Sequence, residues 1–263
     1  MDEHQLRSRL WILSAIILVC VSAGCGKPGY GKVKGKWAWI GWNEAVGRHE
    51  TFIEADLQQF KILKDRQYGK DQSHVFYRGS IIQDADPATF DILPSQAGPS
   101  GQCYSRDQSR VYLEGHRITH ADPASFEVID PPYARDKNRV YCGTVPMQES
   151  DPKTFQILIK TSSWSTMTNK EFFLEMQGGG IDDFEVSEKY PAITSNGCWS
   201  KDARSHYRDA ARIVGADYET FRAIDGSESA DKHRRYMFGL TKDEYDRRVA
   251  ERRQQFQNRR ADR

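Results

Sequence analysis

The chain has 263 residues, of which 38% are hydrophobic and 29% charged, an ordinary composition for a folded protein with a modest core. Its 38 lysines and arginines balance 37 aspartates and glutamates, which leaves a formal net charge of +1. Because no global field draws such a chain to nucleic acid or to an anionic lipid surface, we expect no nucleic-acid partner.

Residues 1–25 have the features of an export segment. Arg7 and Arg9 precede an apolar run over residues 10–24, which is shorter than the roughly 20 residues of a membrane-spanning helix. The run ends in Ser22, two small residues and Cys25. This ending resembles the cleavage site of bacterial lipoproteins, although Ser22 stands where an aliphatic residue is usual. We expect lipidation at Cys25, with an uncleaved anchor helix and simple secretion as alternatives, and all three place the body outside the cytoplasm.

Residues 26–36 are rich in glycine and lysine, a composition that predicts a flexible, solvated tether. Three tryptophans follow at Trp37, Trp39 and Trp42. They fit either a cap over the open core of the first repeat or a platform on which a carbohydrate stacks.

One sequence pattern recurs along most of the chain. An aspartate, the opening Asp, stands nineteen residues before a phenylalanine and fifteen before a second aspartate, the turn Asp. The four strong copies are Asp71, Asp86 and Phe90; Asp107, Asp122 and Phe126; Asp136, Asp151 and Phe155; and Asp202, Asp217 and Phe221. Weaker copies end at Phe60, lie within 169–186 and begin at Asp231. This self-similarity predicts a tandem repeat domain, which we place at residues 37–239.

The other slots of the pattern agree in residue type. Aromatic residues stand three places before and five places after the opening Asp, and a basic residue directly precedes it. A branched aliphatic follows three places after the phenylalanine, and we expect it in the core with the aromatics; these residues are Leu93, Ile129, Leu158 and Ile224.

Local signals within the repeat predict its secondary structure. Val140 and Tyr141 favour a strand, Glu114-Gly115 favours a hairpin turn, and Asp-Pro favours a capped helical turn. The predicted fold is therefore mainly β: a tandem array of repeats of about 30 residues, each a β-hairpin with a short helical turn, between an N-terminal signal or anchor helix and a C-terminal helix.

The run Asp136-Lys137-Asn138-Arg139-Val140-Tyr141, with an aromatic upstream and Asp-Pro-x-x-Phe downstream, resembles the repeats of the DKNYY family of bacterial envelope proteins. The resemblance covers about residues 50–238. Two departures stand out, because Asp202 is not followed by Lys-Asn and Asp217 is not followed by proline. The resemblance implies the repeat architecture and an envelope location, and the family carries no established catalytic activity.

Two segments interrupt the repeats. Residues 95–101 lengthen one connection and predict a surface loop. Residues 162–190 predict a shortened unit with a glycine-rich loop, and they hold Trp164, Glu171 and Phe172. A glycan groove in this stretch, belonging to an envelope enzyme or a glycan-acting accessory protein, is the alternative function that the sequence supports.

Residues 240–263 change in character. Thr241 and Glu244 form a capping-box pattern, which predicts the start of a charged helix. Tyr245, Val249 and Phe256 give this helix one thin apolar stripe. We expect it to pack over the last repeat as a cap, with docking to a partner as the alternative.

Three cysteines, Cys103, Cys142 and Cys198, remain once the export segment is set aside. Outside the cytoplasm thiols tend to pair, so one disulfide with a thiol left over is one interpretation, and small apolar strand residues are the other. His116 and His120 have a spacing that suits zinc on a helix, but they fall in a turn and a strand, so we expect no metal site there. The repeated aspartates favour capping and turn formation over calcium binding.

The motifs of common catalytic sites are absent from this sequence, so we predict no enzyme activity and no cofactor. The leading interpretation is a non-catalytic lipoprotein of the bacterial cell envelope, held at a membrane by its N-terminal lipid or anchor. It would present the face built from its hairpin turns to a protein or glycan partner.

Overall fold

The computed structural model describes residues 28–94, 103–147, 149–161, 164–167, 192–195 and 197–261. The predicted export segment with Cys25, the tip of the loop at 95–101 and most of the stretch 162–190 lie outside these residues. Among the described residues, no helix combines the length and the apolar character that a membrane crossing requires.

In the part of the chain that the structure describes, five antiparallel four-stranded sheets follow one another. In chain order their strands are β4 (Lys61–Ile62), β5 (Tyr68–Lys70), β6 (Val75–Tyr77) and β7 (Ser80–Ile81); β8 (Asp91–Ile92), β9 (Tyr104–Arg106), β10 (Val111–Leu113) and β11 (His116–Ile118); β12 (Glu127–Asp130), β13 (Tyr133–Arg135), β14 (Val140–Cys142) and β15 (Val145–Pro146); β16 (Gln156–Ile159), β19 (Trp199–Lys201), β20 (His206–Arg208) and β21 (Ala211–Arg212); and β22 (Arg222–Ala223), β23 (Glu228–Ala230), β24 (Arg235–Met237) and β25 (Leu240–Thr241). Each sheet is a meander in which the strands pair in the order of the chain.

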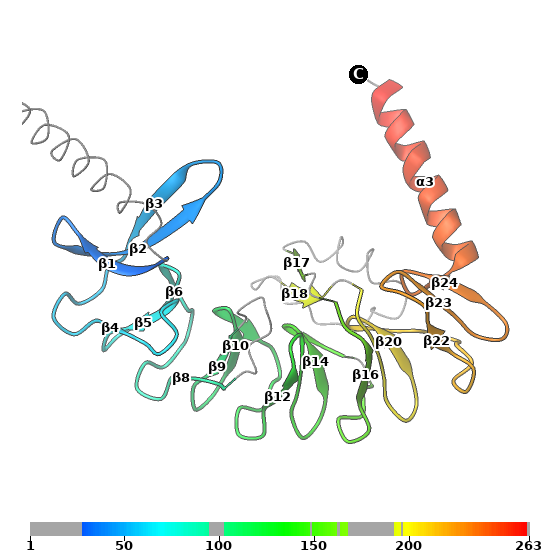
Figure 1. Cartoon of the computed structure of the whole chain (residues 1–263), viewed down its shortest axis with the longest axis horizontal. Helices are drawn as coiled ribbons and strands as arrows, with labels where there is room; N and C mark the ends of the chain where they lie inside the picture. Colours follow the sequence, from blue (N-terminus) through cyan, green and yellow to red (C-terminus); the bar gives the residue numbers. More distant parts are fainter. Residues whose placement is uncertain are drawn as a thin grey trace, which may run out of the picture.

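Three further elements complete the fold. A three-stranded sheet of β1 (Gly29–Val33), β2 (Lys36–Asn43) and β3 (Gly47–Phe52) precedes the array, and α3 (Lys242–Ala261) follows it. The two-stranded pair β17 (Trp164–Met167) and β18 (Ala192–Ser195) interrupts it. The sheets follow an open arc, and β17 and β18 lie on its inner side (Figure 1). The mainly β repeat architecture is thus confirmed.

The prediction of a flexible tether is wrong from Gly29 onward, because these residues form β1 and the start of β2. Lys34 and Gly35 take positive φ angles of 50° and 77° and make the tight turn between these strands. Tyr30 anchors β1, since its ring lies 5.3 Å from Trp39 and 5.2 Å from Phe60. One buried aromatic therefore outweighs the polar composition of its neighbours.

The core is divided into clusters that lie between successive sheets. Phe90, for example, packs against Tyr68 and Val75 of one sheet and Tyr112 of the next. Phe60, Phe126, Phe155 and Phe221 take the same place in the other clusters. Since each small sheet buries its aromatic residues only against its neighbours, stacking is what stabilises the array.

The N-terminal sheet covers the first of these clusters, as the cap interpretation expected. Trp39 is buried beside Phe60 and Phe76, and Trp37 is packed against them. Trp42, in contrast, is 62% exposed at the far end of β2.

Two details of the predicted unit are wrong. Each sheet has four strands and not the two of a hairpin, because the strand that follows each phenylalanine pairs as the first strand of the next sheet, as β8 does with β9. The Asp-Pro segment is a single turn, closed by one hydrogen bond such as that from Thr89 N to Asp86 O (3.3 Å), and not a turn of helix.

Two of the four expected core aliphatics are exposed. A register irregularity between Ile157 and Ile159 turns both of these toward the core and leaves Leu158 41% exposed. Ile224, which follows the short strand β22, is 45% exposed.

Most of the stretch 162–190, predicted as a shortened unit, lies outside the described residues. The first strand of the fourth sheet, β16, pairs directly with β19, and β17 and β18 are an insertion between them. The fourth sheet therefore continues directly from β16 to β19.

The C-terminal helix begins as predicted but does not cover the last sheet. Glu244 N donates to Thr241 Oγ1 (3.3 Å), which is half of the predicted capping box. The Glu244 carboxylate instead binds Arg247 and Arg248. Tyr245 contacts Phe238 with ring centres 5.6 Å apart, but residues 251–255 are all exposed, and α3 points away from the array (Figure 1).

The meander gives the array two distinct edges. At one, the aspartate edge, lie the turn between the second and third strands and the Asp-Pro turn that leads to the next sheet. At the other, the loop edge, lie the connection between the first and second strands and the turn between the third and fourth. The insertion carrying β17 and β18 joins a first to a second strand, so it belongs to the loop edge (Figure 1).

Candidate functional site

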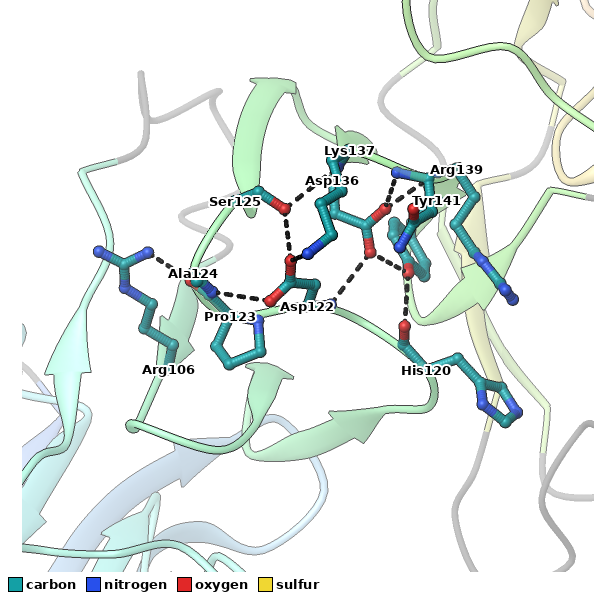
Figure 2. A network of polar contacts seen from close by, with 11 residues as sticks. Arg106, His120, Asp122, Pro123, Ala124, Ser125, Asp136, Lys137, Arg139 and Tyr141 are labelled. Atoms are coloured by element: carbon teal, nitrogen blue, oxygen red, sulfur yellow. Dashed lines mark hydrogen bonds and ion pairs between the residues drawn. The ribbon is translucent and has the colours of Figure 1, made fainter.

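The opening Asp of each strong copy is buried at the aspartate edge, where it orders the turn that follows it. Asp136 is 3% exposed, and its Oδ1 accepts N–H groups from Asn138 (2.7 Å) and Arg139 (2.9 Å). The Tyr141 hydroxyl donates to Oδ2 at 2.7 Å. Figure 2 shows these bonds converging on one carboxylate. The aromatic slot five places after the opening Asp is thus polar as well as apolar.

The same carboxylate also joins two sheets. The Asp122 N–H, from the turn that precedes β12 and β13, donates to Asp136 Oδ2 at 3.0 Å (Figure 2). Equivalent bonds run from Asp56 to Asp71, Asp86 to Asp107, Asp151 to Asp202 and Asp217 to Asp231, at 2.8–3.1 Å. We call this set of opening Asp, turn Asp and their partners the aspartate network. The bond from Asp151 to Asp202 forms although 51 positions separate the two aspartates.

The turn Asp acts as the predicted cap, and it uses a partner that the sequence reasoning missed. Asp122 Oδ1 accepts the Ala124 N–H (3.2 Å), and Oδ2 accepts the Ser125 hydroxyl (2.8 Å). Ser125 Oγ accepts in turn the N–H of Lys137 (3.1 Å), the residue after the next opening Asp. Thr89, Thr154 and Thr220 make the same pair of contacts. The sequence signal for this partner is the serine or threonine that stands directly before the phenylalanine of each strong copy.

The basic residue before each opening Asp binds the Asp-Pro turn that leads from its own sheet to the next one. Arg106 donates to Pro123 O (2.6 Å), and Lys70 and Arg135 donate to the equivalent carbonyls of Pro87 and Pro152. The fourth copy departs from this pattern because Tyr218 replaces proline. There the Lys201 ammonium lies 5.9 Å from the Tyr218 ring centre, and the Tyr218 hydroxyl donates to Asp202 O.

The pKa shifts follow from these hydrogen bonds. Burial opposes ionisation of Asp231, but donors that include the Asp217 N–H and the Tyr236 hydroxyl outweigh it and hold the Asp231 pKa well below its usual range. The Lys137 ammonium, with its Nζ 2.8 Å from Asp122 Oδ2, lowers the pKa of the Asp122 carboxyl. The network is therefore built for ionised carboxylates with little free capacity to coordinate a cation.

The structure joins no two of the three body cysteines by a disulfide. Cys142 lies within β14, and Cys198 directly precedes β19 in the same cluster. The Cys103 thiol donates to Asp65 Oδ2 at 2.7 Å, and burial raises its pKa to about 12. Such thiols are poor nucleophiles.

Metal ligation finds no support in the described residues. Across 28–261, apart from the gaps given above, no group of three or more His, Cys, Asp or Glu side chains converges on one point. His116 lies in β11, and burial lowers its pKa, while His120 lies beyond the strand in a turn.

The insertion is anchored at the loop edge by a residue that the sequence analysis did not single out. Asp209 is fully buried, and its Oδ1 accepts the N–H groups of Gly197 (3.0 Å) and Cys198 (2.9 Å), where the chain returns from the insertion. Arg208 pairs with it at 3.0 Å. Such a buried pair orders the base of the insertion without reaching its surface.

Two open hollows lie side by side along the loop edge. The first, of about 510 Å³, lies between the N-terminal sheet and the first repeat sheet and is bordered by Trp39, Trp42 and His49. The second, of about 480 Å³, lies between the turns that follow β6 and β10 and is bordered by Tyr77, Glu114 and Arg117. Arg78 borders both hollows, so they meet at this residue, and we call the two together the groove of the loop edge.

Glycines in the turns let the sheets approach closely beside this groove. Gly79 and Gly115 take φ angles of 87° and 79°, which suit the tight turns after β6 and β10. A Cβ at Gly79 would lie 2.9 Å from the Trp39 Cβ, and one at Gly115 would lie 3.0 Å from the Tyr77 Cβ. The groove is thus shaped by the repeat itself.

The fold and the aspartate network together define a β-sheet repeat protein whose sheets are joined by buried aspartates. Comparison with family models gives the DKNYY family, matched over residues 46–114 and 104–239. Since these matches span most of the 263 residues, the chain belongs to the DKNYY family. No curated protein and no solved structure matches the chain.

Proposed function

We propose that this protein is a non-catalytic binding protein of the bacterial cell envelope that presents its loop edge to a partner. The observation that carries the proposal is the division of labour between the two edges. Every described turn at the aspartate edge is occupied by hydrogen bonds that hold the array together. The long connections and the groove instead lie at the loop edge.

Repeat proteins place function where the repeat varies, because insertions there leave the stacked core unchanged. The connection between first and second strand holds two residues between β12 and β13, the pair Pro131 and Pro132, but runs from 160 to 198 between β16 and β19. The edge that varies in length is therefore the edge that supports recognition.

An N-terminal lipid on Cys25 completes the proposal, with a retained anchor helix as the alternative. A tethered position suits a chain with a formal net charge of +1, which has no strong field of its own to hold it at a membrane. Mass spectrometry of the N-terminus purified from its own bacterium tests this part. A diacylglycerol on Cys25 supports the lipoprotein, and an intact Met1 favours the anchor.

The binding role is tested by photo-cross-linking in cells with a benzoyl-phenylalanine residue at single exposed positions. Ser80 and Ile81 sample the loop edge, and Ala88 and Ala124, on Asp-Pro turns, are matched controls at the aspartate edge. We expect discrete cross-linked products from the first pair only. Products of equal yield from both pairs, or products from the control positions alone, would overturn the proposal.

A further inference from the structure

We propose that the groove along the loop edge binds a linear glycan that carries carboxylate groups. This inference rests on the proposed function and names the class of ligand for the same edge. Three features of the groove carry it: an exposed indole at one end, arginines at its centre and far end, and neutral hydrogen-bonding groups between them.

The indole comes from Trp42. It is 62% exposed although it stands in a strand whose neighbour Trp39 is buried, so it takes no part in the cap. The Trp42 ring borders the first hollow together with Gly41. The absence of a side chain at Gly41 leaves room for the imidazole of His49, since a Cβ at Gly41 would lie 2.5 Å from that imidazole. A flat aromatic face next to polar groups matches a pyranose ring, which has an apolar C–H face and a rim of hydroxyls.

The arginines supply the charge. The Arg78 Nε donates to Gln67 Oε1 at 2.7 Å, and its guanidinium lies 5.1 Å from the Tyr77 ring centre. These two contacts hold Arg78 at the boundary where the hollows meet. Arg117 borders the second hollow from β11. A planar guanidinium binds a carboxylate through two parallel hydrogen bonds.

The acidic residue of the groove does not cancel this preference. Burial raises the pKa of Glu114, with Arg78 acting in the opposite direction. The described lining therefore has two arginines against one half-buried glutamate. Ser80 and Gln83, both exposed, also border the second hollow and offer neutral hydrogen-bonding groups to sugar hydroxyls.

The shape of the groove favours a glycan chain over a protein. Each hollow has a volume typical of a small-molecule site, and a chain of sugars occupies consecutive hollows as its rings repeat. A stable protein interface buries about 800 Å² on each partner around an apolar centre. Along the groove, the large apolar side chains that are exposed are Trp42 and Ile81, and they border different hollows.

The test is isothermal titration calorimetry of the full chain, purified in a mild non-ionic detergent. The probes are a hyaluronan tetrasaccharide, which carries carboxylates, and chitotetraose, a neutral chain of the same length. We expect the acidic tetrasaccharide to bind at least about tenfold more tightly than the neutral one. Equal affinities, or no binding of either at millimolar concentration, would overturn the inference.

Three variants locate the site. W42A is expected to weaken binding of both chains about tenfold, while R78Q and R117Q each remove most of the preference for the acidic chain. K153Q, an exposed cation on the Asp-Pro turn at the aspartate edge, is the matched control and should leave both affinities unchanged. Unaltered binding by W42A and R78Q would place the glycan elsewhere and contradict the proposal.

The outcomes separate this inference from the function on which it rests. If the loop-edge positions cross-link to a protein and neither tetrasaccharide binds, the glycan inference fails and the binding role stands. If neither edge cross-links specifically and neither sugar binds, both fail.

Discussion

The turns at the two edges of the array differ in their residues and in their contacts with neighbouring sheets. At the aspartate edge, Asp122, Ser125 and Asp136 form one connected network in which each polar group has a partner in the next sheet (Figure 2). At the loop edge, the turns after β6 and β10 contact their neighbours through glycine and leave Arg78 and Arg117 bordering an open groove. The comparison teaches that the repeated residues mark the joints between sheets, and that the proposed binding surface is formed by residues that differ between the repeats.

Acid should have the largest effect on stability, because it protonates aspartates at all the joints between sheets. The pKa values of Asp71, Asp122 and Asp231 lie below their usual range in the folded chain. The unfolded chain therefore takes up protons first, so the stabilisation is complete above about pH 4 and is lost as the pH falls below it. Burial also lowers the pKa of His206 to about 4 and that of His116, so the unfolded chain gains protons at these residues below about pH 6.5. We expect a gradual fall of the melting temperature below about pH 6.5, then a steep fall below about pH 4 to unfolding near pH 2.

Circular dichroism melts at a series of pH values measure this profile. Burial raises the pKa of Glu114, a carboxyl at the loop edge, so this group gains stability as the pH falls, and E114Q should keep the acid limb or make it slightly steeper. A melting temperature that stays level down to pH 2 would show that the aspartate network does not hold the sheets together.

Removing one opening Asp should have the next largest effect. In D136A, the N–H groups of Asp122, Asn138 and Arg139 and the Tyr141 hydroxyl lose a shared buried acceptor. We expect a loss of about 4 kcal/mol in the free energy of unfolding, measured by urea denaturation. R117A at the loop edge is the control and should change stability by less than about 0.5 kcal/mol. Similar losses for the two variants would remove the distinction between the edges.

A single hydroxyl tests the polar role of the second aromatic slot. Y141F deletes a hydroxyl whose single proton is shared between Asp136 Oδ2 (2.7 Å) and His120 O (3.1 Å) but keeps the ring, so we expect a loss of about 1–2 kcal/mol. The chain contains its own precedent, since Phe76 occupies this slot beside Asp71 and its ring is still buried. F76Y should thus be neutral or slightly stabilising in the same urea experiment. A larger loss for Y141F than for D136A would contradict the order of these contributions.

Removal of the insertion should have the smallest effect on the free energy of unfolding, although it changes the most residues. Replacing residues 162–196 by Asn-Gly keeps Thr161 and Cys198, whose N and Sγ atoms lie 3.3 Å apart, so the ends already meet. Because β16 pairs with β19 without the insertion, we expect the free energy of unfolding to change by no more than about 1 kcal/mol. A loss as large as that of D136A would mean that the insertion belongs to the core.

The sequence predicted the joints of this fold better than its sheets. The spacing of opening Asp, turn Asp and phenylalanine located every core cluster, because these residues recur at fixed intervals and have one structural task each. Strand pairing was harder to predict. The connection between the first and second strands, such as β8 and β9, differs in length from one sheet to the next, and periodicity does not say which neighbour a two-residue strand will join. The four-stranded sheet was therefore missed.

The sequence was less informative at the N-terminal end, in the insertion and at the groove. Composition suggested a tether at 26–36, but Tyr30 packs into the first core cluster and residues from Gly29 onward form strands. Local resemblance suggested a unit at 169–186, which lies outside the described residues, and the bond from Asp151 to Asp202 shows where the array continues. For the groove, Trp42 was noticed and Arg78 was not, since no sequence rule brings residues of separate sheets to one surface.

The bond between turn Asp and opening Asp also bears on how such chains arise. Each joint is encoded in two halves, such as Asp122 with one sheet and Asp136 with the next. A duplicated stretch of gene that runs from one opening Asp to the following one carries the second half of one joint and the first half of another. Inserted in tandem, it makes a complete new joint and leaves the existing ones intact. The family can therefore lengthen its arc by whole sheets through internal duplication, with no new interface to evolve at each step.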